Sequence, residues 1–273
     1  MKTQRQVFFL SDRTGITAET LGNSLLSQFD DIEFQRTTLP FINTPDKAHS
    51  TVAWIARMSD VTQPPIIFST TVNDDIRAIL RTAQGQFFDP FDTWLGGLEQ
   101  ALGLPSAHVE GRAHGMPDRT RYESRIDAMN FSLMHDDGQT ARNLERSDVI
   151  LVAPSRCGKT PTCLYMAMQH GLFCANYPLI EEDLEAVQLP SPIRPYQPKI
   201  YGLICDVDRL HQIRTERRPG SKYASLPQCQ FELSQAEMLF KRFGIPYLNT
   251  SNTSIEEIAA HIMQDKNLRR HAF

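Results

Sequence analysis

The segment Ala153-Pro154-Ser155-Arg156-Cys157-Gly158-Lys159-Thr160 joins an apolar run to a helical pattern. The run is Val149-Ile150-Leu151-Val152, and the pattern places Leu164, Ala167 and Met168 on one helix face. A buried strand, a tight turn and a helix start form a phosphate cradle, because the first N–H groups of a helix are unpaired and its dipole favours anions there. In such a cradle Lys159 would reach a terminal phosphate, and the Thr160 hydroxyl would bind Mg²⁺. The alternative is an ordinary strand–turn–helix in which Gly-Lys-Thr is accidental.

The first position of this loop departs from the phosphate-loop consensus, which has glycine where this chain has Ala153. Because Pro154 follows, Ala153 should be extended with a negative φ. We therefore expect the turn to close without a left-handed residue at its first position.

Bulk properties limit the function classes. The 273 residues suffice for two α/β domains, and 41% apolar with 22% charged residues is typical of a soluble globular protein. A net charge of −4 argues against a main role in nucleic-acid binding. No apolar run could span a bilayer, and the run at 7–10 is too short for a signal peptide, so we expect a cytoplasmic protein without membrane contact. Five cysteines without a C-x-x-C pair make a disulfide framework or zinc site unexpected.

Strands and helices alternate along the N-terminal half. Apolar runs at 7–10 and 65–69 and the segment 33–38 predict strands, and helical spacing follows each of them, for example Ala18, Leu21, Gly22, Leu25 and Phe29. This alternation predicts an α/β fold, with a parallel sheet covered by helices on both faces. A helix with Trp94, Leu95, Leu98 and Leu102 should close an N-terminal α/β domain over 1–105.

The rest of the chain is expected to form a connection and a second domain. Residues 103–121 lack apolar periodicity, and a helix over 122–135 should carry Ile126, Met129 and Leu133 on one side, so 106–146 is assigned to a linker and connecting helix. Residues 147–273 are assigned to a phosphate-loop, nucleotide-binding catalytic domain. Its other expected features are a strand at 200–205 and two capping boxes, Ser234-x-x-Glu237 and Ser254-x-x-Glu257, each opening a helix.

Charged residues near the loop are candidates for chemistry. Asp206 lies just past the strand at 200–205, where nucleotide enzymes place an acid that holds Mg²⁺ or its waters, although such an acid can also cap the next helix. Arg156 lies in the loop itself, and a guanidinium there could neutralise charge during phosphoryl transfer. Further arginines follow Asp206, at positions 209, 214, 217 and 218, where a solvated helix face is the alternative.

Two other polar groups are weaker candidates. The turn Ser11-Asp12-Arg13-Thr14-Gly15 between a strand and a helix could bind phosphate or a partner's acidic side chain, or Ser11, Asp12 and Thr14 could serve only as caps. The group His135-Asp136-Asp137-Gly138 could supply a general base or metal ligand, or it could be a solvated helix end.

Several ordered segments resemble the family of bifunctional regulators of phosphoenolpyruvate synthase and pyruvate,phosphate dikinase. The matching stretches are Ser11 to Gly22, Arg125-Ile126-Asp127-Ala128, His135-Asp136-Asp137-Gly138, Val152 to Pro161, Ala175-Asn176-Tyr177-Pro178-Leu179, Tyr201-Gly202-Leu203 with Asp206, and Tyr223-Ala224. They run almost from end to end of the chain. Ala153 departs from this family's loop as well.

The resemblance implies an unusual pair of reactions. Such proteins use ADP to phosphorylate a threonine of the partner enzyme, which inactivates it, and remove that phosphate with inorganic phosphate to give pyrophosphate. Here Lys159 would contact the transferred β-phosphate, Thr160 would place Mg²⁺, Arg156 would stabilise charge, and Asp206 would orient the metal or deprotonate the threonine. Asp136 or Asp137 could be a second acid. A small-molecule kinase and a non-catalytic nucleotide-sensing adaptor are the competing interpretations, and whether the chain forms a homo-oligomer stays open.

Overall fold

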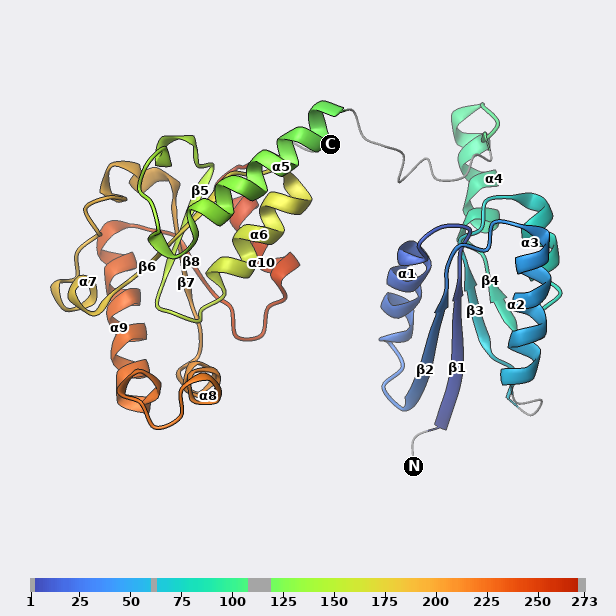
Figure 1. Cartoon of the computed structure of the whole chain (residues 1–273), viewed down its shortest axis with the longest axis horizontal. Coiled ribbons are helices and arrows are strands. Elements are labelled where there is room, and N and C mark those ends of the chain that lie inside the picture. The colour runs from blue at the N-terminus through green and yellow to red at the C-terminus, as the bar shows by residue number, and fades with distance from the viewer. Residues whose placement is uncertain (1–2, 60–62, 108–118, 270–273) are drawn as a thin grey trace. The chain divides into compact units, whose positions relative to one another are not determined.

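A computed structural model describes residues 3–59, 63–107 and 119–269. The chain divides into two compact units, Met1–Gly115 and Met116–Phe273. Each unit contains one four-stranded, all-parallel sheet with helices on both of its faces (Figure 1). The predicted α/β fold class is confirmed.

The first unit is built around strand β1 (Thr3–Leu10), whose side chains alternate between two buried faces. Its elements are α1 (Ile16–Leu26), β2 (Ile32–Leu39), α2 (Pro45–Met58), β3 (Ile66–Ser69), α3 (Asp74–Leu80), β4 (Gln86–Phe88) and α4 (Pro90–Leu102), and the strand order is β2-β1-β3-β4. Val7 and Phe9 pack with the α1 side, whereas Phe8 and Leu10 pack with α2 and α3. Burial on both faces explains the continuous apolar run of this strand.

Two helix faces in the first unit differ from the expectation. Helix α1 buries Ala18, Gly22 and Leu26, while Leu25 and Phe29 are exposed. Helix α4 buries none of its residues, so the apolar spacing that includes Trp94 does not face this unit's core. Helical spacing alone does not determine which face of a helix is buried, because that depends on the contacts between the helix and the sheet. Strand β4, only three residues long, was too short for its pattern to be recognised.

The second unit has β5 (Val149–Ala153) near its centre, in the strand order β6-β5-β7-β8. The elements before β5 are α5 (Arg119–Met134) and the 3-10 turns η2 (Asp136–Gly138) and η3 (Leu144–Arg146). Those after it are α6 (Lys159–His170), β6 (Cys174–Pro178), α7 (Glu181–Ala186), η4 (Arg194–Lys199), β7 (Ile200–Ile204), α8 (Val207–Arg217), η5 (Lys222–Ala224), α9 (Leu226–Phe243), β8 (Tyr247–Asn249) and α10 (Ile255–Asp265).

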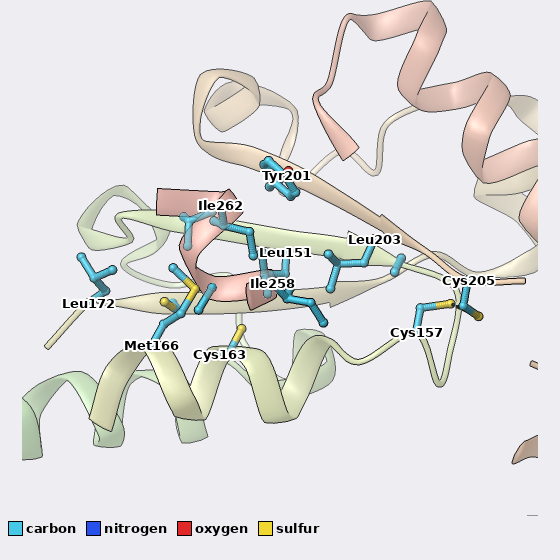
Figure 2. Packing of buried hydrophobic residues seen from close by; sticks show 14 of the residues in the cluster. Leu151, Cys157, Cys163, Met166, Leu172, Tyr201, Leu203, Cys205, Ile258 and Ile262 are labelled. Carbon is cyan, nitrogen blue, oxygen red and sulfur yellow. Dashed lines mark hydrogen bonds between the residues drawn. The ribbon is translucent and has the colours of Figure 1, made fainter. Parts of the chain in front are cut away.

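Two apolar clusters enclose β5. Val149 and Leu151 pack with α6 and α10, as Figure 2 shows for Leu151, Met166 and Ile262. Ile150 and Val152 pack on the opposite face with residues of α5, α7 and α9. This double burial holds the carboxyl end of β5 in place, and the loop with Gly-Lys-Thr starts there.

The capping box predicted at Ser234 and Glu237 is wrong, because the N-cap of α9 is Ser225, nine residues earlier, and the helix begins at Leu226. Proline in its first turn suits that start, since this position needs no N–H donor. The capping box at Ser254 and Glu257 is confirmed at the start of α10.

The side of α5 that carries Ile126, Met129 and Leu133 is not its buried face. Ile126 and Leu133 are exposed, whereas Ala128, Phe131 and Ser132 of the helix are buried, as is His135 just after its end. The helix starts at Arg119, inside the segment expected to be a linker, of which 108–118 lies outside the described residues. The observed face matters because it directs the end of α5 toward the start of α6.

Candidate phosphate-binding site

The loop between β5 and α6 contains two left-handed residues, Arg156 with φ of 78° and Gly158 with φ of 87°. Ala153 is not among the residues with positive φ, so the turn closes without a left-handed first position, as expected. A left-handed conformation at a non-glycine residue such as Arg156 costs free energy and marks a segment held by its surroundings. Arg156 is itself exposed, and Gly158 is the N-cap of α6.

Lys159 lies under the loop, with only 4% of its surface exposed. Its Nζ donates to the carbonyl oxygens of Ala153 and Pro154, at 3.3 Å in each case. Burial lowers the pKa of this ammonium group, and the nearby carboxylates of Asp136 and Asp137 act in the opposite direction. Neutral carbonyls compensate a buried cation only partly, so the site favours an anion close to Nζ.

The group at the end of α5 is joined directly to the loop. The Thr160 hydroxyl donates to Asp136 Oδ1 at 2.7 Å. Asn176 on β6 donates to the same carboxylate and, at 3.2 Å, to Thr160 Oγ1, while its own Oδ1 accepts from the Asp137 N–H at 2.9 Å. Asp136 therefore lies at the loop. Asn176 was missed as a site residue, although β6 neighbours β5 in a parallel sheet and this adjacency was the available signal.

His135 has a structural role beside this cluster. It is 3% exposed, and its two ring nitrogens lie 2.8 Å from Phe131 O and 2.7 Å from Arg142 O. Its ring also stacks on Phe131. With both nitrogens engaged by carbonyl oxygens, the imidazole holds the turn that positions Asp136.

Arg214 of α8 supports the loop from within the protein. It is fully buried and donates through two nitrogens to Ser155 O, at 3.3 and 3.0 Å. It also pairs with Glu232 at 3.1 and 2.7 Å and donates to Tyr223 O at 3.0 Å. The Tyr223 hydroxyl lies 3.1 Å from Ser155 Oγ. Arg214, expected to face phosphate or solvent, is instead buried and stabilises the loop through Ser155. Sequence spacing did not predict its contact with Glu232.

Asp206 is the N-cap of α8, but its side chain makes no capping hydrogen bond. Its Oδ1 accepts from Asn249 Nδ2 at 2.8 Å, and its N–H donates to Ser251 Oγ at 2.6 Å. Asp206 is thus bonded to the last residue of β8 and to Ser251 just after it, rather than to Lys159 or Thr160. Its carboxylate is exposed at the same carboxyl edge of the sheet where β5 ends.

The predicted N-terminal turn belongs to the other unit. Asp12 is 3% exposed, and its carboxylate accepts from the Val72 N–H at 2.9 Å. Ser11 Oγ accepts from the Arg13 N–H at 3.1 Å, while Thr14 is exposed and Gly15 is the left-handed N-cap of α1. Ser11 and Asp12 therefore tie adjoining loops together in this structure.

The oxygen donors at the start of α6 suit a hard divalent cation. Thr160 and Asp136 offer a hydroxyl and a carboxylate, which are the ligand types that Mg²⁺ prefers. Within 3–59, 63–107 and 119–269, no group of three or more His, Cys, Asp or Glu side chains could hold a metal ion. In the same residues, no helix has the length and apolar character required to cross a membrane.

Comparisons with known proteins cover almost the whole chain. The model of the kinase/pyrophosphorylase family matches residues 7–263. A phosphoenolpyruvate synthase regulatory protein of Alkalilimnicola ehrlichii is 49% identical over 273 residues, which are 100% of this chain and 99% of that protein. Proteins of the same name from Bordetella parapertussis and Pseudomonas aeruginosa are 50% and 49% identical, over 98% and 99% of both chains.

Proposed function

Because the chain belongs to the kinase/pyrophosphorylase family, we propose that it switches a phosphoenolpyruvate synthase off and on. It would inactivate the synthase by ADP-dependent phosphorylation of a threonine. It would reactivate the synthase by transferring that phosphate to inorganic phosphate, which gives pyrophosphate. The names of full-length relatives support the choice of protein substrate.

The observation that carries the proposal is the loop between β5 and α6. Left-handed residues at Arg156 and Gly158 curve the backbone, and Lys159 and Thr160 open the helix. Helix N-terminal N–H groups with a buried ammonium beneath them are suited to a diphosphate. We place the β-phosphate of ADP there, in contact with Lys159.

The residues around Thr160 fit Mg²⁺, which the Thr160 hydroxyl and the Asp136 carboxylate would hold. When bound, the ion would neutralise negative charge on the phosphate oxygens. Asn176 donates to both side chains and so keeps them oriented toward the same point.

Both reactions follow from one arrangement of groups. In the forward direction the threonine oxygen bonds to the β-phosphorus, the bond to the AMP oxygen breaks, and a carboxylate accepts the threonine proton. In the reverse direction an oxygen of inorganic phosphate bonds to the phosphothreonine phosphorus, the bond to the threonine oxygen breaks, and the proton returns to that oxygen. We assign the proton transfer to Asp206. We assign to Arg156, which is exposed at the loop, the stabilisation of negative charge on the transferred phosphoryl group.

Incubation with ADP labelled at its β-phosphate and purified synthase tests this function. Label on a synthase threonine supports it, and added phosphate should then release the label as pyrophosphate. Label on a metabolite alone would indicate a small-molecule kinase, and no transfer with nucleotide still bound would indicate an adaptor.

A matched pair of variants ties the transfer to the loop. Lys159→Ala should reduce both directions by about a hundredfold or more. Lys241→Ala, on the exposed surface of α9, should retain the rates of the unmodified chain. Unchanged transfer by Lys159→Ala would remove the loop from the mechanism.

A further inference from the structure

Two cysteine side chains from distant parts of the sequence meet at the phosphate-binding loop. Cys157 lies in the loop, between Arg156 and Gly158, and Cys205 follows β7. Their Sγ atoms are 3.5 Å apart. Figure 2 shows the two side chains next to each other at one end of the sheet. Cys157 is 1% exposed and Cys205 is 7% exposed.

We propose that Cys157 and Cys205 are an oxidisable dithiol, which a peroxide converts to a disulfide that weakens diphosphate binding at the loop. The site is one of reversible covalent modification. Formation of the disulfide follows from the contact between the two sulfurs, and the effect of the disulfide on binding rests on the proposed function of the loop.

The sulfurs need only a small movement to bond. A disulfide has an S–S length of about 2.05 Å, so the two atoms must approach by roughly 1.5 Å. All five cysteines lie within the described residues and are free thiols, and Cys157 and Cys205 are joined by a sulfur–sulfur hydrogen bond. Cys163, Cys174 and Cys229 are as deeply buried, so the pairing is selective by position.

The reaction balances with hydrogen peroxide as oxidant. Cys205, the more exposed of the two, reacts first as the thiolate: its sulfur bonds to one peroxide oxygen, the O–O bond breaks, and the second oxygen leaves as water after taking a proton. The Cys157 sulfur then attacks the sulfenic sulfur of Cys205, the S–O bond breaks, and a second water leaves with the Cys157 proton. Two thiols and one peroxide give one disulfide and two waters.

The loop must absorb most of the movement. β7 is fixed by pairing with both β5 and β8, whereas the hydrogen bond that the Cys157 carbonyl accepts from Thr250 Oγ1 is long, at 3.5 Å, and the support from Arg214 acts two residues away, at Ser155. A hydrogen bond from a backbone N–H to phosphate fails when the distance grows by about 1 Å. Loss of one such charge-assisted bond lowers affinity by about tenfold or more.

The test compares the reduced and the peroxide-treated full chain. Peptide mapping after alkylation of free thiols should find a Cys157–Cys205 cross-link, and calorimetry with Mg²⁺ and ADP should show a Kd raised about tenfold or more. Dithiothreitol should reverse both changes. If Cys157 and Cys205 are both still alkylated as free thiols after peroxide treatment, the proposed disulfide is refuted. A Cys157–Cys205 cross-link without a change in the Kd for ADP would refute its proposed effect on binding.

Matched variants separate this inference from the function on which part of it rests. Cys205→Ala should bind ADP like the reduced chain and lose both the cross-link and the sensitivity to peroxide. Cys229→Ala, which removes an equally buried thiol from α9, should retain both. Failure of the reduced chain to bind ADP would count against the proposed function. Peptide mapping of the unmodified chain would still show whether Cys157 and Cys205 form a disulfide.

Discussion

Replacing Arg214 with methionine should destabilise the second unit strongly. The guanidinium is fully buried and bonds to Ser155 O, Tyr223 O and both carboxylate oxygens of Glu232. Methionine fills similar space but leaves the Glu232 carboxylate, 12% exposed, without its cation. Breaking a buried ion pair from one side costs about 3–5 kcal/mol, a large part of the ~5–15 kcal/mol that stabilises a typical domain.

The expected signal is a lower melting temperature, by roughly 6–20 °C for a unit of this size. Far-UV circular dichroism would follow the unfolding of the helices. Both tryptophans, Trp54 and Trp94, lie in the first unit, so their fluorescence provides an internal control that should change far less.

A second substitution tests the cause of the loss. Arg214→Met with Glu232→Leu removes both charges, and it should recover most of the lost stability because an apolar pair can replace a buried ion pair. A double variant as unstable as the single one, or a single variant shifted by less than about 1 kcal/mol, would refute the ion-pair reasoning.

Three further predictions concern the site itself. Asp136→Asn should weaken binding of ADP with Mg²⁺ by about tenfold or more in calorimetry, whereas Asp208→Asn on α8 should leave it unchanged; equal affinities would remove Asp136 from the metal site. Asp206→Asn should slow transfer of labelled phosphate about a hundredfold while ADP affinity is retained, and unaltered transfer would exclude Asp206 as the base. Because burial lowers the pKa of Lys159, its charge is lost at a lower pH than that of an ordinary lysine, and ADP affinity should fall as the pH rises from 7 to 10. Lys159→Arg, which stays charged, should flatten that profile, and a flat profile in the unmodified chain would contradict the assignment.

Residues close together in the sequence indicated much of the site. The apolar run before Ala153 and the Gly-Lys-Thr start of α6 predicted the strand, the loop and the helix, and these are where the structure has them. The extended Ala153 followed from Pro154, because proline restricts the residue before it. The Asp136–Asp137 pair was recognised as a candidate, but its position relative to the loop was not.

Local pattern alone therefore determined the fold class, the strand, loop and helix of the candidate site, and the helix caps with a clear partner, such as Ser254 with Glu257. Tertiary structure alone decided that Asp136 and Asn176 meet Thr160, that Arg214 braces Ser155, and that Cys157 contacts Cys205. The physical reason is range: backbone propensity and capping act within a few residues, whereas these contacts join residues separated by 16 to 59 positions. Only the order of strands in the sheet and the helix faces packed on it bring such residues together.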